Sequence, residues 1–466
     1  MIRPTTTLVL ILLLIPAYGS RLPFVSPFFT SSAGVPESHN LPLSSWARSA
    51  VASSSPAILR NSPDTSSWGA LANWSPSYLE AALGSRPLPS KTQPLSFANA
   101  GAYFARGCCP LSPRSPTSIL SDPSEAGYAS VPGEWMLEKM DPSQKGNALA
   151  ADIGDTSVFA RAVNPNAPHL EEPVHQVWLS SPNVITALHN DHPANFFLQI
   201  YGWKRFVLFP AELYVELGLF PRSSFFHRKP AVDIRTRPDL ARGPCWKGPL
   251  PCDRMTQVVG RNRTQWRARM EALEGAGLVV TLHEGDVLYL PPLWFHSVLT
   301  LDASISTNFW IPTPAQDLLE GLWDISLPPQ AGLWTALDVV DAVGGAMPRP
   351  DFVDSLQERW WMAMDMEGHF GAHPDDPDWK GYLEDERSAF FTQRSDLTDR
   401  DADLLDDIPP PASVPDLVHD VSSRALALVR DAQALGASDG VIEIAVSHWL
   451  ESLVEHQGGF VERPYA

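Results

Sequence analysis

The sequence predicts a mainly β core of sandwich or barrel type, followed by a helical region. Short β-branched and aromatic runs, separated by turn residues, fill the middle of the chain. After Ala315 the apolar residues recur with a helical period of about 3.6 residues. The 16 tryptophans among 466 residues, 44% of them hydrophobic, fit dense aromatic packing in one large or two ordinary domains.

The first residues predict a targeting sequence. Residues 1–19 combine Arg3, the apolar run Leu8–Ile15 and small residues before position 20, which is typical of a cleaved signal peptide. The run is too short to cross a bilayer, so we expect no membrane span after cleavage. Residues 20–78 are rich in Ser and Pro and lack periodic apolar residues, so a disordered targeting or linker segment is expected.

Two destinations remain open for this start. A signal peptide favours the secretory pathway, with the endoplasmic reticulum lumen or secretion as the end point. A signal followed by a Ser/Pro-rich stretch also resembles the two-part address of some plastid proteins.

Residues 79–314 are predicted to form the β-rich domain. The expected strands are Val174–Leu179, Asn195–Ile200, Arg205–Phe209, Leu278–Leu282, Val287–Leu290 and Ser304–Trp310. Helices are expected around Gly133–Met140 and at Thr264–Leu273. The connection Glu212–Gly277 is long and basic, and could be a solvated surface or a polyanion-binding patch. Its Cys245 and Cys252 could form a disulfide in an oxidising compartment.

Residues 315–466 form an acidic helical region. They carry 30 of the 53 acidic residues and 9 of the 34 basic residues, which argues against a nucleic-acid partner for this part. Helices are expected at Gln316–Trp323, Phe352–Met366, Val414–Leu435 and Val441–His456. The last two have apolar stripes long enough to pair with each other or to form a homodimer with a second subunit.

His189, Asp191 and His296 are the predicted metal ligands. Alternate side chains of a strand share a face, so His189 and Asp191 point the same way. Two imidazoles and one carboxylate are the ligand set that holds non-haem Fe(II) with open positions. His-x-Asp alone is weak evidence, and the competing histidines His192, His227 and His283 are interpreted as surface or neighbouring residues.

The order of residues around this set resembles the Jumonji-C branch of the cupin superfamily, in particular its small hydroxylases. The matching positions are Thr186, His189, Asp191, Asn195, Gly202, Lys204, Arg205, Phe206–Pro210, Gly285, Asp286, Leu288, Tyr289, Pro291, His296 and Asn308–Trp310. The resemblance covers about 174–312. It implies a double-stranded β-helix, the cupin-like jelly roll, with flanking helices.

The resemblance also implies a chemistry. It implies a dioxygenase that uses Fe(II), O2 and 2-oxoglutarate as co-substrate to hydroxylate a C–H bond, with a protein side chain as the expected substrate. Lys204 would pair with the distal carboxylate of 2-oxoglutarate, and Thr186 would add a hydroxyl donor. Asn195 and Asn308 resemble amides that line the site near the metal-chelating end. No catalytic residue beyond the metal centre is expected.

Other functions stay open at this stage. The chain could be a cupin-fold binding protein that kept its ligands without turnover. A lysine demethylase or an RNA-modifying hydroxylase is disfavoured, since no chromatin-reading module or zinc pattern accompanies the predicted barrel.

Overall fold

The structure is a computed structural model. It describes residues 34–83, 88–93, 111–121, 126–132, 147–166, 173–222, 228–230, 272–273, 275–328, 331–356, 359 and 413–457. The predicted signal peptide, the helix at 133–140, the cysteine pair Cys245 and Cys252 and most of the helix at 264–273 lie outside the described residues.

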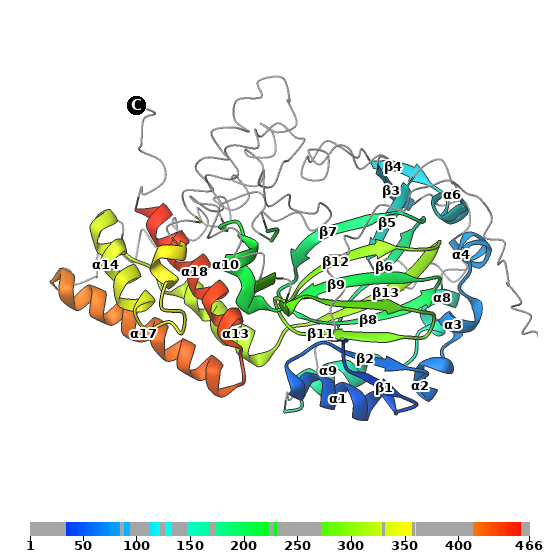
Figure 1. Ribbon diagram of the computed structural model, residues 1–466, viewed down its shortest axis with the longest axis horizontal. Coiled ribbons are helices and arrows are strands. Elements are labelled where there is room, and N and C mark those ends of the chain that lie inside the picture. Colours follow the sequence, from blue (N-terminus) through cyan, green and yellow to red (C-terminus); the bar gives the residue numbers. More distant parts are fainter. Residues whose placement is uncertain are drawn as a thin grey trace, which may run out of the picture.

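Two β-sheets form the core (Figure 1). The larger has the order β1 (Glu37–His39), β2 (Ala57–Arg60), β11 (Val287–Leu290), β8 (Ala194–Tyr201), β13 (Ser304–Ile311), β6 (Val174–Ser180), β5 (Ala126–Pro132), β3 (Leu88–Gln93) and β4 (Leu111–Arg114). The smaller has the order β10 (Leu278–Leu282), β9 (Lys204–Phe209), β12 (Phe295–Thr300) and β7 (Ile185–Asn190). Apart from the β1–β2 pair, the strands pair antiparallel, as in a jelly roll. The predicted mainly β, cupin-like fold class is confirmed.

Alternation along β8 shows how the layers are built. Phe197 packs against Phe206 of β9 in the space between the sheets, with ring centroids 5.0 Å apart. Phe196 points the other way, where it contacts Trp46 of α1 (Leu43–Ser53) and Phe159 of α9 (Ser157–Val163). Both faces of β8 are therefore covered, which explains why it is mostly apolar and buried at all but its last residue.

The N-terminal part of the chain belongs to the fold. β2 pairs with β11, with Ile58 opposite Leu288, and α1 packs its Trp46 on the outer face of the larger sheet. The helices α2 (Pro63–Ser66), α3 (Gly69–Asn73) and α4 (Pro76–Leu83) follow. The prediction of disorder over 20–78 is therefore wrong for 34–78. This segment is held to the core by a few large buried side chains. Its apolar residues do not recur with a helix or strand period, so its sequence resembles that of a linker.

Short helices complete the N-terminal half of the described chain. They are α6 (Pro116–Ser121) and α8 (Asn147–Asp152), and α6 contacts β5 and β6 of the larger sheet. Asp152, at the end of α8, accepts hydrogen bonds from the side chains of Asn73 (3.1 Å), Trp74 (2.9 Å) and Tyr78 (2.7 Å). A carboxylate with this many donors serves to join helices.

The acidic C-terminal region packs its helices against one end of the β core (Figure 1). Its helices are α13 (Pro314–Glu320), η4 (Gly321–Asp324), α14 (Gly332–Gly344), α17 (Val414–Ala434) and α18 (Asp439–His456), and the short helices η3 (Ala211–Leu213) and α10 (Tyr214–Leu217) after β9 pack with them. The predicted helices at 316–323, 414–435 and 441–456 are present, whereas α14 was not predicted. Of the helix predicted at 352–366, residues 352–356 are helical and most of the rest lies outside the described residues.

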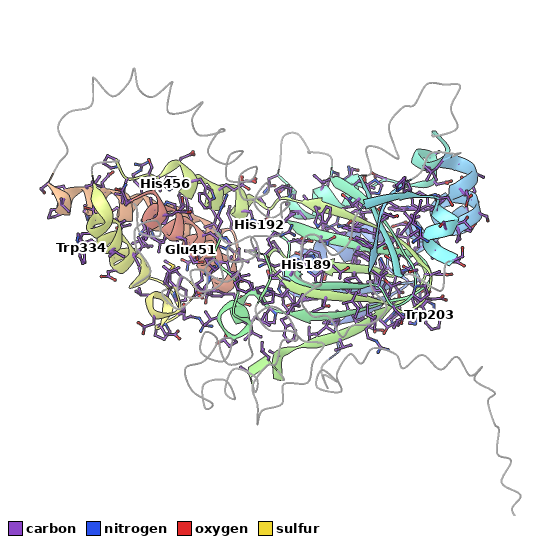
Figure 2. All side chains as sticks on the ribbon, turned by 90° about the horizontal axis from the view of Figure 1, so that it is seen from above. His189, His192, Trp203, Trp334, Glu451 and His456 are labelled. Carbon is purple, nitrogen blue, oxygen red and sulfur yellow. The ribbon has the colours of Figure 1, made fainter. Side chains whose placement is uncertain are left out.

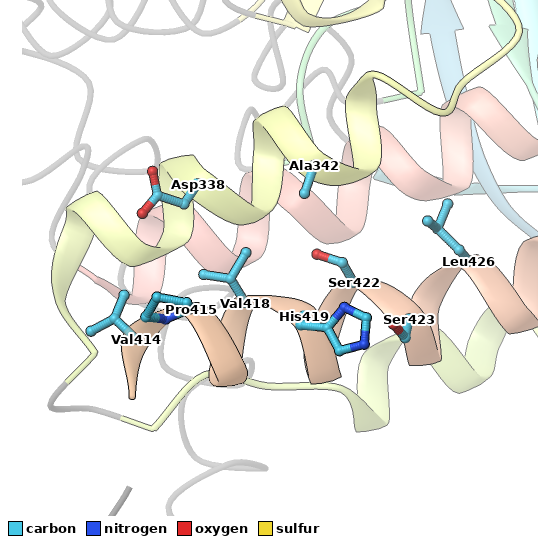
Figure 3. Close-up of a pocket in the computed structure, with 9 residues that line it drawn as sticks. All are labelled: Asp338, Ala342, Val414, Pro415, Val418, His419, Ser422, Ser423 and Leu426. Atoms are coloured by element: carbon cyan, nitrogen blue, oxygen red, sulfur yellow. The ribbon is translucent and has the colours of Figure 1, made fainter. Parts of the chain in front are cut away.

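Most of the surface of α18 is buried against other parts of the same chain. Fourteen of its 18 residues are buried, and Trp449 donates a hydrogen bond to the carbonyl of Ile325 at 2.9 Å. α17 leaves one face open toward α14, where Val418, His419 and Leu426 help to line a groove of about 600 Å³ (Figure 3). A homodimer through these helices stays a prediction. Among the described residues, no helix has both the length and the apolar character to cross a membrane.

Gly202, in the turn between β8 and β9, occupies a position where only glycine fits without strain. Its φ is +69°, and an added Cβ would lie 2.0 Å from the carbonyl oxygen of Ala303. We expect Gly202→Ala to lower the free energy of unfolding by more than about 2 kcal/mol. Gly436 has a φ of +86° but nothing within 4 Å of an added Cβ, so Gly436→Ala should cost only about 1 kcal/mol. Denaturant titrations measure both, and equal losses would contradict the role of the Ala303 contact.

Candidate metal centre and anion pocket

The structure brings His189, Asp191 and His296 together. His189 lies near the end of β7, Asp191 directly after it, and His296 is paired with His189 across the β7–β12 ladder. Their ligand atoms all lie within 4.8 Å of one another. His189 Nε2 is 3.9 Å from Asp191 Oδ1, and His296 Nε2 is 3.6 Å from Asp191 Oδ2. Two imidazole nitrogens and a carboxylate thus converge on one point, a donor set that fits a divalent metal.

Neighbouring groups orient these ligands. His296 Nδ1 lies 3.1 Å from the carbonyl oxygen of Trp294 and donates to it, which leaves the Nε2 lone pair for a metal. Trp310 Nε1 donates to Asp191 Oδ2 at 3.1 Å. The Trp294 carbonyl contacts the His296 nitrogen opposite Nε2, and Trp310 contacts one of the two Asp191 oxygens. These contacts fix the orientation of His296 and Asp191 before a metal binds.

The protonation states suit metal binding. Burial alone would raise the pKa of Asp191, but His189, His296 and Arg228 outweigh it and hold the pKa below its ordinary value. Burial lowers the pKa of His296, although Asp191 opposes this. The carboxylate is therefore ionised and the His296 ring neutral near pH 7, the forms that bind a metal.

Lys204 is a buried cation without a carboxylate partner among the described residues. Its Nζ donates to Ser306 Oγ at 2.8 Å and lies 5.4 Å from the centre of the Phe197 ring. Burial lowers the pKa of Lys204 to about 7. An ammonium group with only a neutral hydroxyl partner is costly to bury, so this position favours a bound anion.

Asn195 and Asn308 contact each other on adjacent strands. Asn308 Nδ2 donates to Asn195 Oδ1 at 3.1 Å, and Trp178 Nε1 donates to Asn308 Oδ1 at 2.7 Å. Thr186 is half-buried on β7, and its carbonyl accepts a hydrogen bond from Ser297 Oγ at 2.8 Å. The structure thus gives the two amides fixed positions, while the ligand contacts of these three residues stay predictions.

Tyr128 is a neighbour of the site that the sequence did not reveal. It lies on β5, and its ring stacks on Trp178 with centroids 5.6 Å apart. Burial, with a contribution from the negative charge of Asp191, raises the pKa of Tyr128. Its phenol therefore stays protonated and can donate a hydrogen bond near the metal centre. No pattern marks this residue, because the strand around it is short and broken by Gly and Pro.

Two of the three competing histidines, His283 and His192, do not join the ligand set. His283 lies by Asp286, with Nδ1 3.5 Å from the carboxylate, and packs on the half-exposed Trp203. Figure 2 places Trp203 away from His189. His192 is exposed, its ring 6.3 Å from that of His448. His227 lies outside the described residues.

The profile of the cupin-like domain family matches residues 42–317, more than half of the chain. The chain belongs to this family. The match begins at residue 42, directly before α1 and well before residue 79, in agreement with the packing of the N-terminal segment. The resemblance to cupin-like Jumonji-C proteins is confirmed.

Several Jumonji-C relatives are similar to this cupin-like chain. The human "Bifunctional peptidase and (3S)-lysyl hydroxylase JMJD7" is 26% identical over 258 residues, 55% of this chain and 76% of the relative. "Lysine-specific demethylase 8" of Xenopus tropicalis is 23% identical over 287 residues, 61% of this chain and 54% of the relative. "Lysine-specific demethylase JMJ30" of Arabidopsis thaliana is 28% identical over 139 residues, 30% of this chain and 26% of the relative. The chain thus spans only about half, or less, of the second and third relatives.

Proposed function

We propose that this cupin-like protein is an Fe(II)- and 2-oxoglutarate-dependent dioxygenase that hydroxylates a C–H bond, with a protein side chain as substrate. One observation carries the proposal: the barrel interior holds both the His189–Asp191–His296 ligand set and Lys204, a buried cation with no carboxylate partner among the described residues. The co-substrate has the matching chemistry, since one end can chelate a metal and the other is a free carboxylate. The lysyl hydroxylase named among the relatives supports a protein substrate.

The residues of this chain have distinct tasks in the proposed reaction. A bound iron would supply oxygen activation, held by His189, Asp191 and His296. Lys204 would neutralise the distal carboxylate of 2-oxoglutarate in a site that excludes water. The protonated phenol of Tyr128 would donate a further hydrogen bond to the co-substrate. No side chain needs to act as a general acid or base in this scheme.

Succinate release tests the proposal. The full chain is incubated with Fe(II), ascorbate, 2-oxoglutarate and cell lysate, and lysate peptides are then mapped for the mass of one added oxygen. We expect succinate and oxidised peptides with the wild type and neither with Asp191→Ala. If the wild type binds 2-oxoglutarate but releases no succinate, the chain is a binding protein and the enzymatic proposal is wrong. Loss of a methyl group from lysine in place of gain of oxygen would favour a demethylase.

We also propose a secretory destination, with the plastid as the alternative. Arg3, the run Leu8–Ile15 and the small residues after it support cleavage near residue 19. N-terminal sequencing of the mature chain tests this, because a two-part plastid address would be removed further along. A mature chain that still begins at Met1 would contradict both.

A further inference from the structure

Arg228 is the one cation that contacts the metal-binding carboxylate among the described residues. Its guanidinium forms an ion pair with Asp191 Oδ1, and 44% of its side chain stays exposed. It therefore reaches from solvent to the metal centre. His189 Nε2 lies 3.9 Å from the same oxygen, and His296 Nε2 lies 3.6 Å from the other oxygen, Oδ2.

The position of Arg228 is fixed by the main chain. Its Nε donates to the carbonyl of Asn190 at 2.9 Å, and its own carbonyl accepts from the Asn190 N–H at 3.0 Å. Two residues on, Pro230 forms a bridge with Leu219. Because Asn190 precedes Asp191, this anchoring ties Arg228 to the end of β7. These contacts hold the guanidinium in a fixed position at the metal site.

Among the residues that the structure describes, the acidic side chains near Asp191 on α13 and α18 already have partners. His192, the residue after Asp191, is exposed, and Gln316 of α13 contacts its carbonyl (His189 and His192 are labelled in Figure 2). Asp317, the next residue of α13, already has an interaction partner. Glu451 of α18 pairs with the buried Arg359 at 3.0 Å.

We propose that Arg228 is a specificity-determining residue that selects substrates with a carboxylate close to the oxidised carbon and disfavours lysine. This rests on the proposed function. A metal needs only part of the Asp191 carboxylate, and the planar guanidinium keeps donors that can pair with a carboxylate in a bidentate way. A lysine ammonium would meet a like charge at the same point. The substrate class would therefore differ from that in the name of the lysyl hydroxylase relative.

Peptide binding tests this without turnover. The full chain is titrated, with Mn²⁺ in place of iron and with 2-oxoglutarate, into labelled peptide pools of equal length that are rich in Asp and Glu, rich in Lys and Arg, or uncharged. Fluorescence anisotropy gives the affinities. We expect the wild type to bind the acidic pool at least about fivefold more tightly than the basic pool. Arg228→Lys should keep this preference, Arg228→Gln should lose it and Arg228→Glu should reverse it.

Arg424→Glu is the matched control. Arg424 is an exposed residue of α17 that pairs only with Asp420, at 3.9 Å among the described contacts, and carries the same change of charge. Its preference should equal that of the wild type. Equal or tighter binding of the basic pool by the wild type, no binding of the acidic pool, or equal effects of Arg228→Glu and Arg424→Glu would overturn the proposal. Absence of succinate release with the preference intact would count against the oxygenase proposal alone.

Discussion

Lys204→Met is expected to raise the KM for 2-oxoglutarate by at least about 100-fold, because it removes the buried cation that, in the proposed function, would pair with the distal carboxylate. Methionine keeps the length and apolar stem of lysine, so the pocket stays filled. Steady-state succinate release at varied 2-oxoglutarate measures the effect. An unchanged KM would contradict the assignment of Lys204 to the co-substrate.

The same substitution should not weaken the empty protein. Burial lowers the pKa of Lys204 from 10.5 to about 7, so the unfolded chain binds the proton more strongly than the folded chain does. Between about pH 7 and pH 10.5 this residue makes stability rise with pH, and below pH 7 its burial cost is fully present. Lys204→Met should therefore be at least as stable as the wild type at pH 7 and should lack this part of the pH dependence. Denaturation curves of both proteins across this range measure the difference, and parallel curves would contradict it.

His296→Ala is expected to weaken binding of Co²⁺ or Mn²⁺ by at least about 100-fold, since it removes one of three protein ligands. His192→Ala is the matched control, because His192 is exposed next to Asp191 but does not belong to the ligand set. Calorimetric titration of the metal-free proteins measures both affinities. If the His192 variant loses as much affinity as the His296 variant, the ligand assignment is wrong.

The sequence was most informative where residues repeat with the strand period. The strands at 278–282 and 287–290 have exactly the predicted bounds, since both begin after a turn residue and end at a break. His189 and Asp191 could be placed on one face because β7 is extended up to Asn190. Strand alternation alone does not identify His296 or Lys204 as site residues. The order of these residues along the chain did so, through the resemblance to Jumonji-C proteins.

The missed features depend on contacts between distant segments. β12 carries His296 but is buried along its whole length, so it has no alternation to mark it. Tyr128 joins the site only because β5 pairs with β6, and Arg228 only because its segment pairs with Asn190. The N-terminal segment was misread because single aromatic residues such as Trp46 hold it to the core.

Anaerobic titration of the full chain with Fe(II) and 2-oxoglutarate tests the central claim most directly, because chelation of iron by the co-substrate gives a visible charge-transfer absorption band. In the wild type we expect the band to saturate at one iron per chain, and in the His296→Ala variant we expect no band. When O2 is admitted, the wild-type band should disappear and one succinate should form per iron. Absence of the band in the wild type at saturating iron and 2-oxoglutarate, or an equal band in the His296→Ala variant, would contradict the claim that His189, Asp191 and His296 hold the iron of a 2-oxoglutarate oxygenase.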